Sequence, residues 1–262
     1  VKNIAAVTED GVAGKYGIAF GSQSTPISPF QQVKKLNPDF DVISVPLVSA
    51  TDEPAKAEGA LNVNVFYVVR KGYPHPEAVV KMQNLYADIW FGSQSHRYSE
   101  MITGDVNGSQ HNFFQYAPIK ATHQGKNIHI HKRIVDVLNG RLPVSELNTE
   151  ERTYYDLMTA YDEGRGDESG WAYKRVFGEE SSLAVHVYYL ENDLYQNSEF
   201  YGLPTETMQT RWQTLMDMEN ETFLKIIIGE PIESFDKFVN DWYNLGGRDI
   251  TNEVNAWYEA NR

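Results

Sequence analysis

The sequence of 262 residues contains no cysteine, which excludes disulfide bridges, catalytic thiols and thiolate metal sites. Long apolar runs are also absent, since no stretch approaches the roughly 20 residues of a membrane-spanning helix. The first residues, 1–7, lack the apolar run of a signal peptide. These absences predict a soluble chain, exported only if a leader has been removed or lies upstream.

Basic residues are scarce: 23 Lys and Arg stand against 36 Asp and Glu, for a net charge of −13. A phosphate-binding surface needs clustered Lys and Arg, and the one dense basic run is His129 to Arg133. An apolar pattern follows this run, so we expect a helix face and no nucleic-acid partner.

His129 and His131 would share a face only on a strand, and no third ligand is set by spacing, so we expect no metal.

Common catalytic signatures are missing as well. The chain has no phosphate-binding G-x-x-x-x-G-K-[ST], no zinc-binding H-E-x-x-H and no serine-hydrolase G-x-S-x-G. Residues 105–109 start like a calcium loop but lack its later ligands, so an Asn-Gly turn is expected. Arg165-Gly166-Asp167 matches an adhesion tripeptide in a Gly-rich charged loop, where chance readily produces it. A glycosidase needs two carboxylates close together in space. With 36 acidic residues in the chain, the sequence alone does not single out such a pair.

What is present is a pattern of apolar segments that begins with strands and ends with helices. Strands are predicted at Tyr16–Phe20, Asp41–Leu47 and Val63–Val69, the last nearly continuous in apolar residues. Helical spacing begins near Pro76. The pair Asn148 and Glu151 predicts a capped helix start.

The C-terminal third is helical throughout in its pattern. One apolar face runs from Met208 to Ile227 and ends at Gly229 and Pro231. A second face ends at the Gly246-Gly247 pair, and a last helix carries Val254, Trp257 and Tyr258. Strands before so many helices suggest a chain that leaves a sheet begun elsewhere.

Several stretches resemble the extracellular solute-binding proteins (family 1, lipoprotein type) of ABC sugar importers. The most specific are Phe200 to Met208, Glu221 to Gly229, Phe235 to Phe238 and Ile250 to Tyr258. Upstream, Phe66 to Val80 and Trp171 to Gly178 are similar to the family's crossing strand with its following helix and to a recurring segment. The resemblance covers most of this chain, in order, but only the C-terminal half of such proteins.

The resemblance implies an α/β, periplasmic-binding-protein-like (type II) fold of two lobes, represented here by its helix-rich C-terminal half. Residues 1–60 would belong to the C-terminal lobe, and 61–199 would form the crossing strand and the helical part of the N-terminal lobe. Residues 200–262 would return to the C-terminal lobe. Two lobes that close over a ligand would then dock on a membrane permease.

The implied function is non-catalytic capture of a carbohydrate, most simply an oligosaccharide, and its delivery to an ABC transporter permease. Sugars offer C–H faces to aromatic rings and hydroxyls to paired donors and acceptors. Phe20 stands where the family often has a Trp after its Gly-rich strand. The expected ligand-binding residues are Phe20, Ser22, Gln23, Trp171, Tyr201 and Trp212.

The resemblance also implies a monomer without cofactor, located outside the cell, and tied to the membrane only by a lipid anchor that this chain does not contain. One alternative is a carbohydrate-active enzyme with a carboxylate pair in an aromatic cleft. Another is an adhesion module that uses Asp167. For Trp212 a core position on its helix is the competing expectation, because it shares a face with Met208 and Met216.

Overall fold

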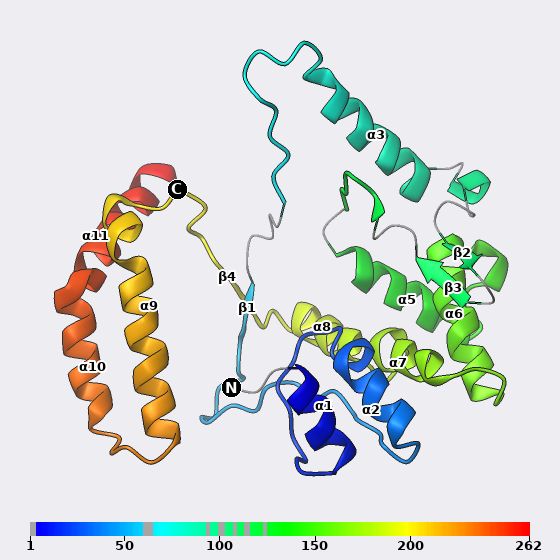
Figure 1. Ribbon diagram of the computed structural model, residues 1–262, viewed down its shortest axis with the longest axis horizontal. Helices are drawn as coiled ribbons and strands as arrows, with labels where there is room; N and C mark the ends of the chain where they lie inside the picture. The colour runs from blue at the N-terminus through cyan, green and yellow to red at the C-terminus, as the bar shows by residue number, and fades with distance from the viewer. Residues whose placement is uncertain are drawn as a thin grey trace. The chain divides into compact units, whose positions relative to one another are not determined.

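The protein is mostly helical (Figure 1). The computed structural model describes residues 4–59, 65–92, 95–98, 103–106, 109–112, 116–122 and 125–262. The α-helices are α1 (Ile4–Val12), α2 (Gln31–Leu36), α3 (Glu77–Phe91), α5 (Lys126–Leu138), α6 (Thr149–Asp162), α7 (Glu168–Phe177), α8 (Ser182–Glu191), α9 (Glu206–Ile227), α10 (Ser234–Trp242) and α11 (Arg248–Asn261).

Short helical turns and strands complete the described elements. The turns are η1 (Pro26–Phe30), η2 (Ser95–Tyr98), η4 (Val144–Glu146) and η5 (Tyr243–Gly247). Strand β1 (Ala57–Gly59) pairs with β4 (Tyr195–Asn197), and β2 (Thr103–Val106) pairs antiparallel with β3 (Ser109–Asn112). The expected Asn-Gly turn, at residues 107–108, lies outside the described part. No described helix is long and apolar enough to cross a bilayer.

Two compact units make up the chain. Unit 1 consists of Val1–Ala57 and Val63–Tyr195, and unit 2 consists of Glu58–Asn62 and Gln196–Arg262. The expected lobes, 1–60 with 200–262 and 61–199 apart, stay a prediction. In unit 1, Phe30 and Val33 pack against Trp171 and Ala172, which joins the N-terminal segment to the helices of this unit.

Unit 1 is built around two clusters of buried side chains. Helices α5 to α8 bury Ile134, Met158 and Leu183, each at most 2% exposed. Tyr154 of α6 packs against Tyr173 and Phe177 of α7, with ring centroids 4.6 and 4.7 Å apart. The second cluster joins η1, α2 and α7. Packing of apolar helix faces, rather than a sheet, therefore holds this unit together.

Polar side chains start and fix several of these helices. The predicted cap is confirmed: the Asn148 side chain accepts from Glu151 N–H at 2.9 Å, and Glu151 accepts from Asn148 N–H at 2.9 Å. Glu151 is buried, and both of its carboxylate oxygens accept a hydrogen bond from Arg133 Nε at 3.0 Å. The charge of Glu151 is thus compensated by an Arg and a backbone donor, as a buried carboxylate requires.

Three predicted strands are wrong in the described part of the chain. Tyr16–Phe20, Asp41–Leu47 and residues 65–69 follow an extended or irregular course without a strand partner, and Val63 and Asn64 lie outside the described residues. A strand is stabilised by its neighbour. Here the segments instead leave apolar side chains exposed, Phe20 by 89%, Ile43 by 71% and Val68 by 90%.

His129 and His131 lie on helix α5, as the basic run predicted, and not on a strand. Residues two apart on a helix point to different sides. The buried His131 places Nδ1 3.0 Å from the Phe177 carbonyl oxygen, while burial lowers the pKa of its imidazole. The two imidazoles thus share no face, and the described residues contain no cluster suited to a metal ion.

Unit 2 contains three helices, α9, α10 and α11, joined by tight turns. Gly229 and Gly246 both have positive φ, 112° and 132°, which permits sharp reversals after α9 and within η5. The rings of Phe223, Phe235 and Phe238 meet at about 6 Å. The C-terminal helices therefore begin and end close to where the sequence predicted.

Candidate ligand-binding site

A hollow of about 730 Å³ lies within unit 2, between the segment that follows β4 and helix α11. This volume is within the range of sites for small organic ligands. Carboxamides, a hydroxyl, a carboxylate and two aromatic rings line it. The lining residues are Gln196, Asn197, Ser198, Glu199, Phe200, Val254, Asn255 and Tyr258.

Backbone contacts place the first wall of the hollow. Strand β4 ends at Asn197, and Ser198 N–H donates to the Gly59 carbonyl oxygen at 2.8 Å. A Cβ at Gly59 would lie 2.1 Å from the Asn197 Oδ1, so a larger residue there would displace the Asn197 side chain. Beyond this contact, five consecutive residues, 196–200, all line the hollow.

Helix α11 supplies the second wall. Val254 and Tyr258 are one turn apart, so they lie on one face, and Asn255 is beside them. Behind this face, Trp257 packs edge-to-face against Phe200 and Tyr201, with ring centroids 4.9 and 4.6 Å away. These aromatic contacts tie the extended segment to the helix and keep the two walls together.

The electrostatics of the hollow are those of a polar site with one acidic group. Glu199 is its single charged lining residue, and its hydrogen bond and negative charge raise the pKa of the Tyr258 phenol. Glu253 precedes the lining residue Val254, but its side chain is hydrogen-bonded to the start of helix α9. Its carboxylate accepts from Thr207 Oγ1 at 2.7 Å, and hydrogen bonds from Thr205 and Thr207 lower its pKa.

The groups that line the hollow suit a polyhydroxylated ligand. Amide and hydroxyl groups both donate and accept, which matches the hydroxyl edges of a sugar, and the rings of Phe200 and Tyr258 offer apolar surface. A glycosidase requires a second carboxylate about 5 to 10 Å from the first. Among the residues lining the hollow Glu199 is the only acid, so the pair is not found there.

Three of the predicted ligand contacts lie together near the start of unit 1, outside the hollow. Phe20 is exposed, and Ser22 Oγ lies 3.0 Å from Ser24 Oγ. The backbone oxygen of Gln23 accepts from Ser182 Oγ at 2.7 Å. Gln23 thereby anchors this turn to the start of α8, and none of the three residues lines the hollow.

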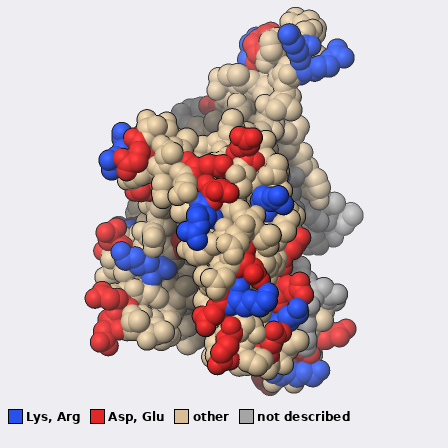
Figure 2. Space-filling view, turned by 90° about the vertical axis from the view of Figure 1, so that its left-hand side faces the viewer, with Lys and Arg blue, Asp and Glu red and all other residues tan. Residues whose placement is uncertain are grey.

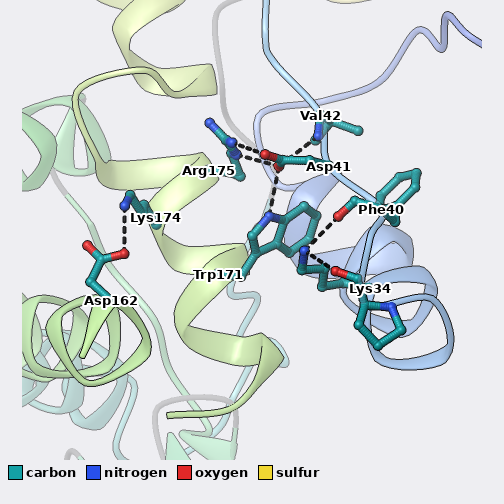
Figure 3. Close-up of polar contacts among 9 residues, drawn as sticks. Lys34, Phe40, Asp41, Val42, Asp162, Trp171, Lys174 and Arg175 are labelled. Carbon is teal, nitrogen blue, oxygen red and sulfur yellow. Dashed lines mark hydrogen bonds and ion pairs between the residues drawn. The ribbon is translucent and has the colours of Figure 1, made fainter. Parts of the chain in front are cut away.

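Trp171 is placed in the core instead of at a surface. It is 3% exposed, and its Nε1 donates to Asp41 Oδ1 at 2.9 Å. Arg175 also donates to Asp41, while Lys34 Nζ lies 5.6 Å from the indole centroid (Figure 3). The ring thus has its polar atom paired and its faces covered, and offers no surface to a ligand.

Tyr201 and Trp212 remain exposed in unit 2, by 63% and 44%. Tyr201 directly follows the lining residue Phe200, and Trp212 lies on α9 rather than in the core. Sequence analysis missed the residues that line the hollow. The signal was available in the carboxamide-rich run Gln196 to Glu199, which immediately precedes the most specific part of the resemblance.

Comparisons with protein-family models, with curated proteins and with solved structures give no match to this chain.

Proposed function

We propose that this chain captures a carbohydrate without chemically altering it, as the ligand-binding part of an extracellular solute-binding protein of an ABC sugar importer. The observation that supports capture is the hollow in unit 2, where three carboxamides, a hydroxyl and a phenol stand beside aromatic surface. The resemblance of Phe200 to Met208 to such proteins supports the wider assignment.

Each part of the lining has a role in this proposal. Asn255 and Asn197 donate and accept hydrogen bonds to neighbouring sugar hydroxyls, which a carboxamide can do in pairs. Phe200 and Tyr258 receive the C–H face of a pyranose. On binding, the sugar and the lining groups lose hydrogen bonds to water as they gain hydrogen bonds to each other. Each new hydrogen bond therefore adds only about 0.5 to 1.5 kcal/mol to binding.

Binding is tested by titration calorimetry and thermal shift against a panel of neutral oligosaccharides. A ligand present at 100 times its dissociation constant stabilises the folded state by about 2.7 kcal/mol, which raises the melting temperature by a few degrees. Release of reducing ends is followed in the same samples. Turnover would overturn capture in favour of an enzyme, and the absence of any bound saccharide would overturn the carbohydrate assignment.

Asn255→Ala tests whether the hollow is the place of binding. Loss of its hydrogen bonds should weaken binding by about two- to tenfold. The matched control is Asn220→Ala, on the exposed surface of α9 and outside the hollow. Equal affinities of the two variants would place the ligand elsewhere.

Delivery to a permease is the second half of the proposal and has its own test. Uptake of the bound sugar by cells that produce the importer should depend on the full protein. Loss of uptake in Asn255→Ala, in proportion to its loss of affinity, is the expected result, and uptake unaffected by removal of the protein would contradict delivery.

A further inference from the structure

The lining of the hollow in unit 2 carries negative charge only. It contains the carboxylate of Glu199 and no Lys, Arg or His. The C-terminal part of unit 2 also has a negative net charge, since residues 196–262 include 12 acidic and five basic side chains and no histidine. Figure 2 shows acidic and basic side chains interspersed on one face of the molecule. A ligand that enters this hollow meets a negative potential.

Glu199 also has capacity for a further partner. Its side chain is exposed at the hollow and hydrogen-bonded to the Tyr258 phenol. A carboxylate offers about four lone-pair positions, and the phenol occupies one. An ammonium group brings three donors and the opposite charge, so it can use the remaining positions. A uronate or sulfate would instead face like charge.

From these observations we infer that the hollow selects saccharides with a free amine, and that Glu199 is the residue that sets this preference. The inference rests on the proposed carbohydrate capture and narrows its ligand class. Neutral hydroxyls are recognised by the carboxamides Asn197 and Asn255, whereas the ammonium is recognised by Glu199. Acidic saccharides are rejected because no cation in the lining compensates their charge.

The test compares four β-1,4-linked trisaccharides by calorimetry: those of glucosamine, N-acetylglucosamine, glucose and glucuronate. N-acetylation converts the ammonium groups of the glucosamine ligand to neutral, bulkier amides, and the glucose ligand provides a neutral comparison without the acetyl groups. At low salt we expect the glucosamine trisaccharide to bind at least about fivefold more tightly than the two neutral ones, with the glucuronate weakest. The preference should shrink near 1 M salt, where screening acts over about 3 Å.

Glu199→Gln should bring the affinity for the glucosamine ligand down to that for its N-acetylated form. Glu233→Gln is the matched control, because it removes the same charge from an exposed position of unit 2 outside the hollow, and it should keep the preference. The salt dependence of the unaltered protein gives an independent measurement should the first variant fold poorly.

Failure of this inference is distinguishable from failure of the proposed function. Equal affinities of the wild-type protein for charged and neutral trisaccharides, or a preference that survives in Glu199→Gln, would overturn the selectivity while capture stands. If none of the four ligands or the wider neutral panel binds, carbohydrate capture falls and the selectivity falls with it.

Discussion

At the scale of single residues, Asp41 joins several polar groups of unit 1. It accepts hydrogen bonds from Val42 N–H, from Trp171 Nε1 and from the Arg175 guanidinium (Figure 3). Lys34 adds a second link, because its Nζ donates to the backbone oxygens of Pro38 and Phe40. The Asp41 bonds fasten the segment after α2 to helix α7, and the Lys34 bonds hold the same segment to α2.

Replacing Asp41 by Ala should lower the free energy of unfolding by about 1 to 2 kcal/mol, because Trp171 loses its acceptor inside the core. The ion pair with Arg175 adds little, since the Asp41 side chain is 52% exposed. Asp41→Asn keeps an acceptor for Trp171 and should cost less. Urea unfolding monitored by circular dichroism measures both variants, and equal losses would show that the charge, rather than the Trp171 bond, matters.

The same contacts predict a pH dependence. Burial alone would raise the pKa of Asp41, but hydrogen bonds from Arg175, Trp171 and Val42 lower it below its ordinary value of 3.8. A lowered pKa in the folded state stabilises the protein above pH 3.8, and this stabilisation is lost as the pH falls through the folded-state pKa. The stability of Asp41→Asn should therefore change less than that of the wild type on acidification below about pH 4. Parallel curves would contradict this.

At the scale of elements, local signals predicted several helix ends. Asn148 with Glu151 opens α6 and Gly229 follows α9, through hydrogen bonds and backbone conformations that neighbouring residues determine. Helices α1 and α2 lie in the first sixty residues, where the pattern predicted strands. The apolar runs were misjudged because a strand requires a partner that no local pattern specifies. Val45 and Val68 belong to such runs, and the structure leaves both exposed without a ladder.

The tripeptide Arg165-Gly166-Asp167 has a structural role at the start of α7. Asp167 is the N-cap, and its carboxylate accepts from Ser169 N–H at 2.9 Å. Asp167→Ala should therefore destabilise unit 1 by about 1 kcal/mol, whereas Asp167→Asn, which can still cap, should be nearly neutral. Thermal unfolding measures this difference. Loss of cell adhesion in Asp167→Asn at unchanged stability would support the adhesion module instead.

The candidate site shows where prediction from sequence stopped. Tyr201 was chosen from the resemblance and lies one residue beyond the lining, whereas Trp171 was chosen for its ring and is buried. The hollow is formed by residues more than fifty positions apart, Gln196 to Phe200 and Val254 to Tyr258. Their proximity depends on the reversals at Gly229 and Gly246, and on Trp257 packing against Phe200, which spacing alone does not reveal.

At the scale of the whole molecule, the two units differ in how much apolar surface they bury. Most of the buried apolar side chains of the described chain belong to unit 1, while unit 2 contributes Leu215 and Ile250. On α9 and after it, Ile227 and Ile228 are 77% and 83% exposed. Local stability follows burial, so unit 2 is the less stable part.

Hydrogen exchange followed by mass spectrometry tests this difference. Backbone amides of α9 to α11 should exchange at least about tenfold faster than those of α5 to α8, and a bound saccharide should slow exchange in α11. Equal protection of the two groups of helices would contradict the prediction. Protection by ligand in α5 rather than α11 would move the binding site out of the hollow.

The burial of Trp171 affects the fluorescence emission of the protein. Of the five tryptophans, Trp171 is the one that is fully buried, and Trp212, Trp242 and Trp257 all belong to unit 2. A shielded indole emits at shorter wavelength than a hydrated one, so the difference between the emission spectra of wild type and Trp171→Phe isolates a signal from unit 1. The melting of unit 1 can then be followed through this difference signal, measured on the two unlabelled proteins.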